Sequence, residues 1–304
     1  MTGGAGFIGS NIIRELLRMG NDVRVLDNFS TGKRENIDDI LNDIQLVEGD
    51  IRSYHILRNV VEDVDFILHH AALPSVPRSI NDPITTHEVN LGGTLNVLEA
   101  ARDAKVKRVI YASSSSIYGN NLILPKREDM NPVPLSPYAV SKLAGENYCK
   151  VFSQIYGLET VCLRYFNVFG PRQDPDSQYS AVIPKFISAM RKNIQPTVYG
   201  DGKQSRDFTY VANIVQANIL ACRTIGISGE VFNVACGKSF TVLDLIHKLN
   251  ELLQKNISPQ FVNAREGEIK HSKADIKKSV KILDYKSEYG FEYGLSETIA
   301  FYDK

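Results

Sequence analysis

Tyr138 and Lys142 are the first and last residues of the run YAVSK, which directly follows Ser136-Pro137. Because proline suits the first turn of a helix, the run predicts a helix that carries both side chains on one face. An ammonium beside a phenol favours the phenolate, a base able to take a proton from a hydroxyl. Lowering a phenol pKa from ~10 to ~7 requires about 4 kcal/mol, whereas an exposed ion pair supplies about 0–1 kcal/mol. The pair is therefore predicted to be catalytic only in a desolvated site, and a chance spacing on a surface helix is the alternative.

A run of four serines, 113–116, closes a predicted strand over Arg108–Ser113. Parallel α/β sheets bind their ligands at the carboxyl ends of the strands. A hydroxyl at that edge, Ser114 in particular, can bond a substrate hydroxyl and relay its proton. An ordinary serine-rich loop is the alternative.

Gly3, Gly6 and Gly9 recur every three residues in the run GGAGFIG, which then opens a helix with Ile8 and Ile12 on one face. Glycines allow a tight turn and let backbone N–H groups reach an anion at the helix N-terminus, where the helix dipole favours negative charge. The loop therefore predicts a binding site for a dinucleotide pyrophosphate.

Asp27 ends the next predicted strand, eighteen residues after Gly9. A carboxylate there accepts bonds from the adenosine ribose hydroxyls and repels a 2′-phosphate, which favours NAD over NADP. A strand-end Asp that caps a turn before Asn28 is the alternative. Asp50-Ile51 follow the third strand and are predicted to line the adenine pocket, although a turn Asp explains Asp50 almost as well.

Short apolar runs alternate with helical patterns through about residue 165, which predicts an α/β fold with a doubly wound parallel sheet (Rossmann). The predicted helices include 8–19, 86–104 and 137–156, and the predicted strands are Val23–Asp27, Gln45–Gly49, Phe66–His69, Arg108–Ser113 and Thr160–Tyr165. Glycine and proline become frequent after Asn167. We therefore expect an NAD-binding domain over 1–167, returning at about 211–235, and a smaller α/β lobe for the substrate over 168–304.

The start of the chain is unusual for this fold, because Met1-Thr2 leads straight into Gly3. A dinucleotide loop needs a preceding strand in the middle of the sheet. We therefore expect the natural chain to begin about one strand length earlier, ~5–6 residues.

The bulk composition points to no charged macromolecular partner. Thirty-five basic residues balance thirty-five acidic ones, so we expect neither nucleic acid nor an anionic membrane as a partner. The four cysteines have no metal-binding spacing, so no metal site is predicted and a reducing cytoplasm is expected.

The motifs together resemble the nucleotide-sugar epimerases of the extended short-chain dehydrogenase family. The resemblance covers nearly the whole chain and rests on TGGAGFIGS (2–10), Asp27-Asn28, HAA (70–72), the serine run, YAVSK and RYFNVFG (164–170). Two longer stretches, SVPRSINDPITT (75–86) and RQDPDSQYSAVIPKF (172–186), resemble UDP-N-acetylglucosamine 4-epimerases in particular.

The resemblance implies a tightly held NAD that is recycled. Tyr138, as phenolate, would take the proton of the sugar 4-hydroxyl while Ser114 bonds the same oxygen. The C4 hydride would pass to the nicotinamide and return on the other face after the 4-keto sugar swings round its phosphate linkage. Lys142 would also bond the nicotinamide ribose, and the positive charge of the oxidised ring would help it to stabilise the phenolate.

The resemblance also implies the binding residues. Beyond the three loop glycines, those implied for NAD are Phe7, Ile8, Asp27, Asn28, Asp50, Ile51, Ala71, Ala72, Asn90, Tyr138, Lys142 and Tyr165. Those implied for the UDP-sugar are Ser75, Ser114, Tyr138, Asn167, Arg206, Arg265, Glu268 and Ser272. Asn167 would contact the pyrophosphate, both arginines would clamp the phosphates, and Glu268 would hold the uridine ribose. For each arginine, a surface charge is the alternative.

Ser272 bears on the sugar. Relatives restricted to plain hexoses carry a bulky tyrosine at this place, and serine leaves room for an N-acetyl group at C2. Because a partly empty pocket costs only ~1–3 kcal/mol, we expect preference for the N-acetylated sugars with residual activity on UDP-glucose. A helix N-cap role for Ser272 is compatible with this.

Ser115 and Ser116 stand where dehydratase and decarboxylase relatives carry carboxylates, which weighs against elimination chemistry. The remaining alternatives are a UDP-glucose or UDP-glucuronate 4-epimerase, a dehydrogenase that releases NADH, and a non-catalytic NAD-sensing protein on the same fold. The resemblance further implies a homodimer in which helices 86–104 and 137–156 pair with their copies, although these helices could equally well only cover the sheet.

Overall fold

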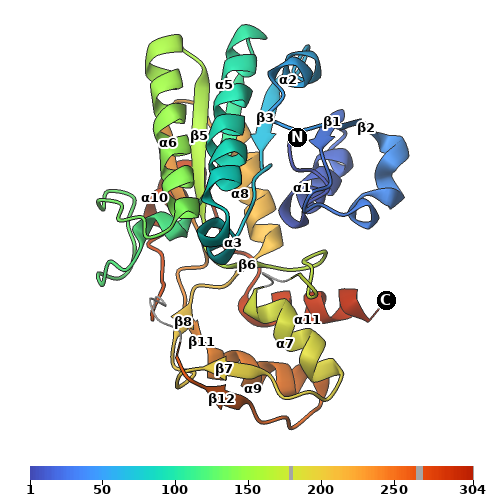
Figure 1. Cartoon of the computed structure of the whole chain (residues 1–304), viewed down its shortest axis with the longest axis vertical. Helices are drawn as coiled ribbons and strands as arrows, with labels where there is room; N and C mark the ends of the chain where they lie inside the picture. The colour runs from blue at the N-terminus through green and yellow to red at the C-terminus, as the bar shows by residue number, and fades with distance from the viewer. Residues whose placement is uncertain (178–180, 265–269, 304) are drawn as a thin grey trace.

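A computed structural model of the chain describes residues 1–177, 181–264 and 270–303. These residues form two lobes (Figure 1). The upper lobe is built on a parallel sheet, and the lower lobe is smaller and contains the helices α7 (Val182–Arg191), α9 (Val242–Leu253) and α11 (Phe291–Tyr302). Within the described part of the chain, no helix is long and apolar enough to cross a membrane.

The sheet of the upper lobe has only parallel neighbours. Its strands in spatial order are β2 (Ile44–Glu48), β1 (Val23–Asp27), β3 (Phe66–His69), β4 (Arg108–Ser114), β5 (Glu159–Tyr165) and β10 (Glu230–Val234). The predictions for β1 and β3 match residue for residue, those for β4 and β5 are one residue short at one end, and that for β2 is displaced by one residue at both ends.

Thr2 stands between β1 and β3, where a central strand is expected. Its N–H donates to the Leu68 carbonyl at 3.1 Å and its carbonyl accepts from His70 N–H at 3.1 Å. On the other side, Gly3 N–H donates to the Leu26 carbonyl at 2.9 Å. These bonds join the two halves of the sheet, so that the glycine loop begins at its centre.

Helices cover both faces of the sheet, as the sequence predicts. One face carries α1 (Phe7–Arg18), α8 (Val211–Arg223) and α10 (Lys277–Leu283), and the other carries α2 (Tyr54–Val60), α5 (Gly93–Asp103) and α6 (Pro137–Tyr156). Alternate residues of β4 pack into the apolar cores on opposite faces of the sheet: Ile110 packs with α8, whereas Val109 packs with α5. This alternation buries both faces of a strand, which explains its continuous apolar sequence. The predicted doubly wound α/β fold is confirmed.

The prediction of one helix over 86–104 is wrong in its first part. After α3 (Val76–Asn81) the chain forms α4 (Pro83–His87), then a π-helical turn η3 (Glu88–Gly92), and only then α5. The Asn90 side chain explains the wide turn, because it accepts from Leu73 N–H at 2.7 Å and donates to the Leu73 carbonyl at 3.0 Å. Single π-turns of this kind occur often at functional sites.

The chain after β5 forms three short pairs of strands. The pairs are β6 (Val168–Phe169) with β9 (Thr209–Tyr210), β7 (Thr197–Tyr199) with β12 (Gln260–Val262), and β8 (Ser205–Arg206) with β11 (Phe240–Thr241). Three 3₁₀ segments, η1 (Arg34–Asn36), η2 (Asp38–Asp43) and η4 (Ser115–Tyr118), lie in the upper lobe. Phe169, Phe208 and Phe291 pack together at the centre of the lower core.

Candidate active site

At two positions of the glycine loop the neighbouring backbone leaves no space for a side chain. Gly3 has φ +70°, and a Cβ atom there would lie 2.6 Å from the Ala71 nitrogen. A Cβ atom on Gly9 would lie 2.2 Å from the Gly3 oxygen. Gly6 precedes α1 and supplies no side-chain cap to its first turn, which contains no acidic residue. The first turn of α1 thus has no side-chain cap, an arrangement that leaves amide groups for a pyrophosphate.

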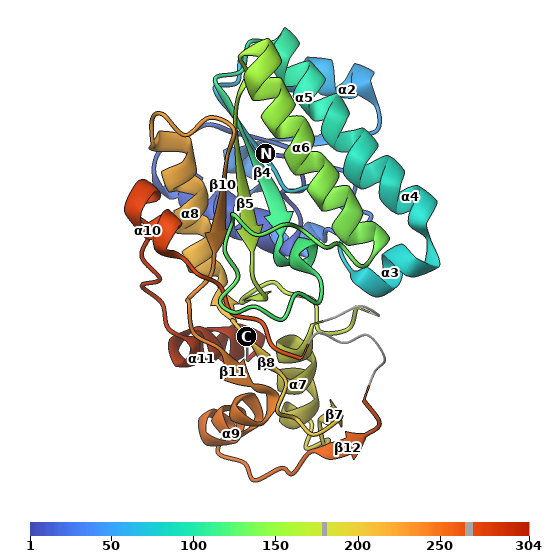
Figure 2. The same cartoon turned by 90° about the vertical axis from the view of Figure 1, so that its left-hand side faces the viewer.

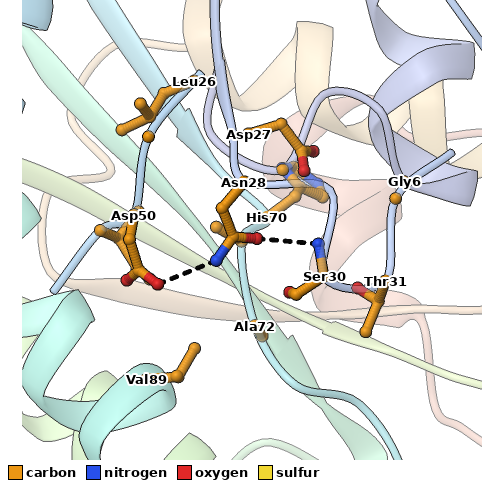
Figure 3. Close-up of a pocket in the computed structure, with 15 residues that line it drawn as sticks. Gly6, Leu26, Asp27, Asn28, Ser30, Thr31, Asp50, His70, Ala72 and Val89 are labelled. Carbon is orange, nitrogen blue, oxygen red and sulfur yellow. Dashed lines mark hydrogen bonds between the residues drawn. The ribbon is translucent and has the colours of Figure 1, made fainter. Parts of the chain in front are cut away.

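A pocket opens beside this loop, at the carboxyl ends of β1, β2 and β3 (Figure 3). Its lining contains many of the residues that the sequence assigns to the dinucleotide: Gly3, Gly6, Asp27, Asn28, Asp50, Ile51, Ala71 and Ala72. The pocket lies at the edge of the sheet where doubly wound folds bind nucleotides. Its position and its glycine walls fit the adenosine half of NAD.

Asp27 is buried at the floor of this pocket. One carboxylate oxygen accepts from Ala5 N–H at 2.9 Å and the other from Phe29 N–H at 2.8 Å. Burial raises the pKa of Asp27, and the backbone hydrogen bonds oppose that rise. Because a carboxylate oxygen has more than one lone pair, Asp27 keeps acceptor capacity for ribose hydroxyls.

Asn28 and Asp50 are hydrogen-bonded to each other in the lining of the pocket (Figure 3). The Asn28 amide donates to Asp50 at 2.8 Å and accepts from Ser30 N–H at 3.1 Å. The Arg52 guanidinium donates to both carboxylate oxygens of Asp50, and these hydrogen bonds lower the pKa of that carboxyl. The rim of the pocket is thus rigidly hydrogen-bonded and carries a charged Asp50.

The predicted catalytic pair lies on α6 against the end of β4. The helix starts at Pro137, where the Ser136 side chain accepts from Ala139 N–H at 3.2 Å. Lys142 is only 4% exposed, and its Nζ donates to the Ala112 carbonyl at 2.8 Å. The same Nζ lies 6.0 Å from the centroid of the Tyr138 ring. The structure therefore brings the pair together in the desolvated surroundings that its chemistry requires.

Burial works against the charged forms of both groups. It raises the pKa of the Tyr138 phenol, while a hydrogen bond with Ser114 lowers it. Burial lowers the pKa of Lys142 to about 8. Ser114 also accepts from Ser116 N–H at 3.1 Å, which orients its hydroxyl. Ser114, Tyr138 and Lys142 thus form one hydrogen-bonding and electrostatic group.

The side chains of four other predicted cofactor-binding residues make contacts within the protein. Phe7 and Ile8 pack their side chains against the apolar cores, so that only their backbone faces the loop. The Asn90 amide is bonded to Leu73, as described above. The Tyr165 hydroxyl is shared between Asn218 at 3.1 Å and His70 at 3.0 Å.

Two functional candidates escaped the sequence reasoning. His70 lines the pocket, its buried Nδ1 has no hydrogen-bond partner in the described structure, and burial lowers its pKa to about 3. Glu146, one turn after Lys142, is buried and paired with Arg164 at 2.7 Å. His70 could have been found from the sequence, because it belongs to the run HAA. Glu146 could not, because its partner Arg164 is eighteen residues away in the sequence.

The lower lobe gathers three of the residues assigned to the UDP-sugar. The Asn167 amide donates to the Asp207 carbonyl at 3.2 Å, and the Arg206 guanidinium donates to the Ser205 carbonyl at 3.0 Å. Ser272 N–H also donates to the Ser205 carbonyl at 3.0 Å. Ser75 lies in the upper lobe as the N-cap of α3, with φ 96°. Arg265 and Glu268 lie outside the described residues.

Comparisons with known proteins agree with this geometry. Residues 1–235 match the family model described as the NAD dependent epimerase/dehydratase family. A UDP-N-acetylglucosamine 4-epimerase from Methanobrevibacter ruminantium, solved with UDP-N-acetylmuramic acid, superposes with TM-score 0.95 at 42% identity over 99% of this chain and 96% of that one. A Thermus thermophilus UDP-glucose 4-epimerase solved with NAD gives TM-score 0.90 at 35% identity, covering 99% and 97%. A UDP-glucose 4-epimerase of Mycolicibacterium smegmatis is 33% identical over 99% of this chain and 97% of its own.

Proposed function

Because the chain belongs to the NAD dependent epimerase/dehydratase family, we propose that it interconverts UDP-N-acetylglucosamine and UDP-N-acetylgalactosamine. The chain is an NAD-dependent UDP-sugar 4-epimerase, and the proposal concerns which sugar it prefers and which residues act. The single observation that supports a catalytic role best is the convergence of Ser114, Tyr138 and Lys142 at the carboxyl end of β4. A protein that only sensed NAD would not need a buried lysine beside a half-buried tyrosine.

The chain's own residues would divide the work as follows. The glycine loop and Asp27 hold the two ends of the adenosine diphosphate, and Lys142 holds the nicotinamide ribose. When bound, NAD supplies a reversible hydride acceptor for C4 of the sugar. Tyr138 takes the proton of the 4-hydroxyl and later returns it, and Ser114 bonds the same oxygen and orients it.

Inversion at C4 requires the sugar to present both faces to the same base. The nucleotide must therefore be held firmly and the sugar weakly. In our proposal Asn167 and Arg206 of the lower lobe contact the diphosphate, while Ser114 and Tyr138 contact the sugar only near C4. Arg265 and Glu268 are proposed to complete the nucleotide site.

Ser272 supports the preference for an N-acetylated sugar. Its backbone is bonded to Ser205, directly beside Arg206, which places it next to the proposed phosphate contacts. A serine in this position leaves space that a tyrosine would fill. Because empty space penalises the smaller sugar only weakly, UDP-glucose remains a substrate in this proposal.

Reactions that eliminate water or carbon dioxide are disfavoured by η4. Ser115 and Ser116 open this segment, and neither hydroxyl has the acidity or basicity of a carboxyl group. The 4-keto sugar in our proposal therefore has one outcome, which is reduction back to a 4-hydroxyl on either face.

The test is to incubate purified protein separately with UDP-N-acetylglucosamine, UDP-glucose and UDP-glucuronate, without added cofactor, and to follow the 4-epimers by NMR. We expect UDP-N-acetylgalactosamine to form fastest, and Tyr138→Phe to abolish its formation. Tyr54→Phe is the matched control, since it removes a hydroxyl that bonds Asp103 on α5, away from the proposed site. If only UDP-glucuronate were converted, the proposed substrate would be wrong and UDP-glucuronate would take its place. If no sugar were converted even with NAD added, the proposed catalytic activity would be refuted.

We also propose a homodimer through the face formed by α3, α4, α5 and α6 (Figure 2). Val140, Val151 and Ile155 recur on one side of α6 and are exposed, with Ile155 at 69%. Ile80 and Ile84 extend this apolar surface onto α3 and α4. An exposed apolar surface of this kind indicates a protein interface.

Sedimentation analysis tests the dimer. Ile155→Glu should yield a monomer at concentrations where the wild type is dimeric, because it puts a charge into the apolar surface. Ile225→Glu is the control, since Ile225 is also an isoleucine and is even more exposed, but lies in the loop between α8 and β10. A wild type that sediments as a monomer, or a dimeric Ile155→Glu, would contradict the proposed interface.

A further inference from the structure

Asp207 lies between three segments of the chain that are far apart in sequence. Its side chain is fully buried. One carboxylate oxygen accepts from Cys236 N–H at 3.0 Å, just after β10, and the other accepts from Ala274 N–H at 3.1 Å. Asp207 itself follows β8. One side chain therefore joins β8, the end of β10 and the segment that leads to α10.

The residues assigned to the UDP-sugar are attached to these same three points. Arg206 precedes Asp207, and the Asn167 amide donates to the Asp207 carbonyl. Ser272 lies two residues before Ala274, and its N–H is bonded to Ser205. Arg206 additionally donates to the Lys270 carbonyl at 3.1 Å. A movement of the Asp207 carboxylate would therefore disturb Asn167, Arg206 and Ser272 together.

The segment around Ser272 is also tied to the upper lobe. Lys126 N–H donates to the Lys273 carbonyl at 2.7 Å, and Asp275 N–H donates to the Lys126 carbonyl at 2.8 Å. Residues 273–275 thus lie between Lys126, in the loop after η4, and the Asp207 carboxylate. The two lobes contact each other here (Figure 2), so that Asp207 fixes one side of this junction.

Among the described residues, Asp207 forms no ion pair. Burial raises its pKa to about 6, while its backbone hydrogen bonds lower it. The chain therefore keeps a buried carboxyl without an ion-pair partner, which is costly, at a point where backbone N–H groups of two different segments converge. A carboxylate is well suited to this task, because both of its oxygens accept and neither donates.

We propose that Asp207 is a positioning residue for the UDP-binding half of the site, holding Asn167, Arg206 and Ser272 in one arrangement through the backbones of Cys236 and Ala274. This inference rests on the proposed function, because it takes those three residues to contact the UDP-sugar. It assigns Asp207 no contact with substrate or NAD. The glycine loop and Asp27 lie in other elements, so NAD binding should not depend on it.

Asp207→Asn tests the inference in the NAD-bound enzyme. The amide keeps one acceptor, but its NH₂ group must face a backbone N–H, so one of the two bonds is lost and a donor is opposed by a donor. Asp201→Asn is the matched control, since Asp201 is an exposed carboxylate of the same lobe that accepts from Lys203 N–H at 2.9 Å. The measurements are KM and kcat for UDP-N-acetylglucosamine, the affinity for UDP by calorimetry, and the bound NAD after denaturation.

We expect Asp207→Asn to weaken UDP binding by about tenfold or more and to raise KM similarly, with kcat and bound NAD changed by less than about threefold. Asp201→Asn should match the wild type in all four quantities. A variant that melts at a lower temperature but keeps the wild-type affinity for UDP and the wild-type KM would overturn the inference, because Asp207 would then be merely structural. A wild type that binds no UDP would instead overturn the proposed function.

Should the variant fail to fold, hydrogen exchange in the wild type decides the question. Peptides that contain Cys236 and Ala274 should exchange more slowly when UDP is added, because UDP would stabilise the arrangement that their amides hold. Unchanged exchange in both peptides at saturating UDP would overturn the inference.

Discussion

Replacing Glu146 by Gln tests what fixes the catalytic helix to the sheet. The Glu146 carboxylate accepts from Arg164 Nε at 2.9 Å and Nη2 at 2.7 Å, and from Ser113 Oγ at 2.5 Å. Ser113 adjoins Ser114, and Glu146 lies one turn after Lys142. The carboxylate therefore joins α6 to the ends of β4 and β5 beside the candidate catalytic residues.

The magnitude follows from the burial of the pair. Both side chains are about 5% exposed or less. Although burial alone would lower it, the bonds and charge of Glu146 raise the pKa of Arg164. Gln offers one acceptor and no charge, so the buried guanidinium keeps the neutral Tyr118 hydroxyl and Glu128 carbonyl but loses its buried counter-ion, at a cost of about 3–5 kcal/mol. With ~2.1 cal/mol/K of unfolding entropy per residue over 304 residues, this corresponds to a fall in Tm of about 5–8 °C.

Urea denaturation of the NAD-bound protein at neutral pH is the assay, with Glu159→Gln as the control. Glu159 also pairs with an arginine, Arg108, at 2.5 Å, but the Glu159 side chain is 48% exposed. In the variant, Arg108 would still donate hydrogen bonds to the carbonyls of Ala221 and Thr224. Glu159→Gln should therefore cost about 0–1 kcal/mol. Converting Glu146 and Arg164 together to Met should restore much of the lost stability. Equal losses in the two single variants would refute the reasoning.

Three further substitutions have specific outcomes. Gly9→Ala should abolish co-purification of NAD, because the added Cβ atom would lie 2.2 Å from the Gly3 oxygen. Gly290→Ala is the control and should retain NAD, because a Cβ atom there would have no other atom within 4 Å. A Gly9→Ala protein that purifies with a full complement of NAD would contradict this prediction. Ser272→Tyr should reduce kcat/KM for UDP-N-acetylglucosamine by about tenfold or more relative to UDP-glucose, and an unchanged ratio would sink the proposed role of Ser272. The folded-state pKa of Asp207 is raised from 3.8 to about 6, so its stabilising contribution is present below pH 3.8 and is lost as the pH rises through 6. From pH 5 to 7.5 the wild type should therefore lose about 1–2 kcal/mol of unfolding free energy relative to Asp207→Asn, and a relative gain would show that the sign is wrong.

The features that sequence reasoning predicted depend on local patterns. Asp27 was placed by the end of an apolar strand, and Tyr138 with Lys142 by helical spacing after Pro137. The π-helical turn η3 could not be predicted, because it depends on hydrogen bonds between Asn90 and Leu73, seventeen residues earlier in the chain. The two-residue strands of the lower lobe are too short to produce a periodic pattern. Asp207 could not be predicted either, because its role depends on Cys236 and Ala274, which are distant from it in the sequence.

The electrostatics of Tyr138 lead to a prediction about the proposed mechanism, in which proton abstraction and redox chemistry are coupled. Burial raises the pKa of the phenol and lowers that of Lys142 to about 8, so each group is harder to ionise here than in water. We therefore expect that Lys142 alone does not stabilise a phenolate at neutral pH, and that a further positive charge beside the pair is required. The oxidised nicotinamide has such a charge and the reduced ring does not, so the base should exist only when a hydride acceptor is present. An absorbance titration of the NAD-bound and NAD-free proteins checks this, with Tyr138→Phe as the reference. A tyrosinate that forms at neutral pH without NAD would show that the chain activates Tyr138 by itself.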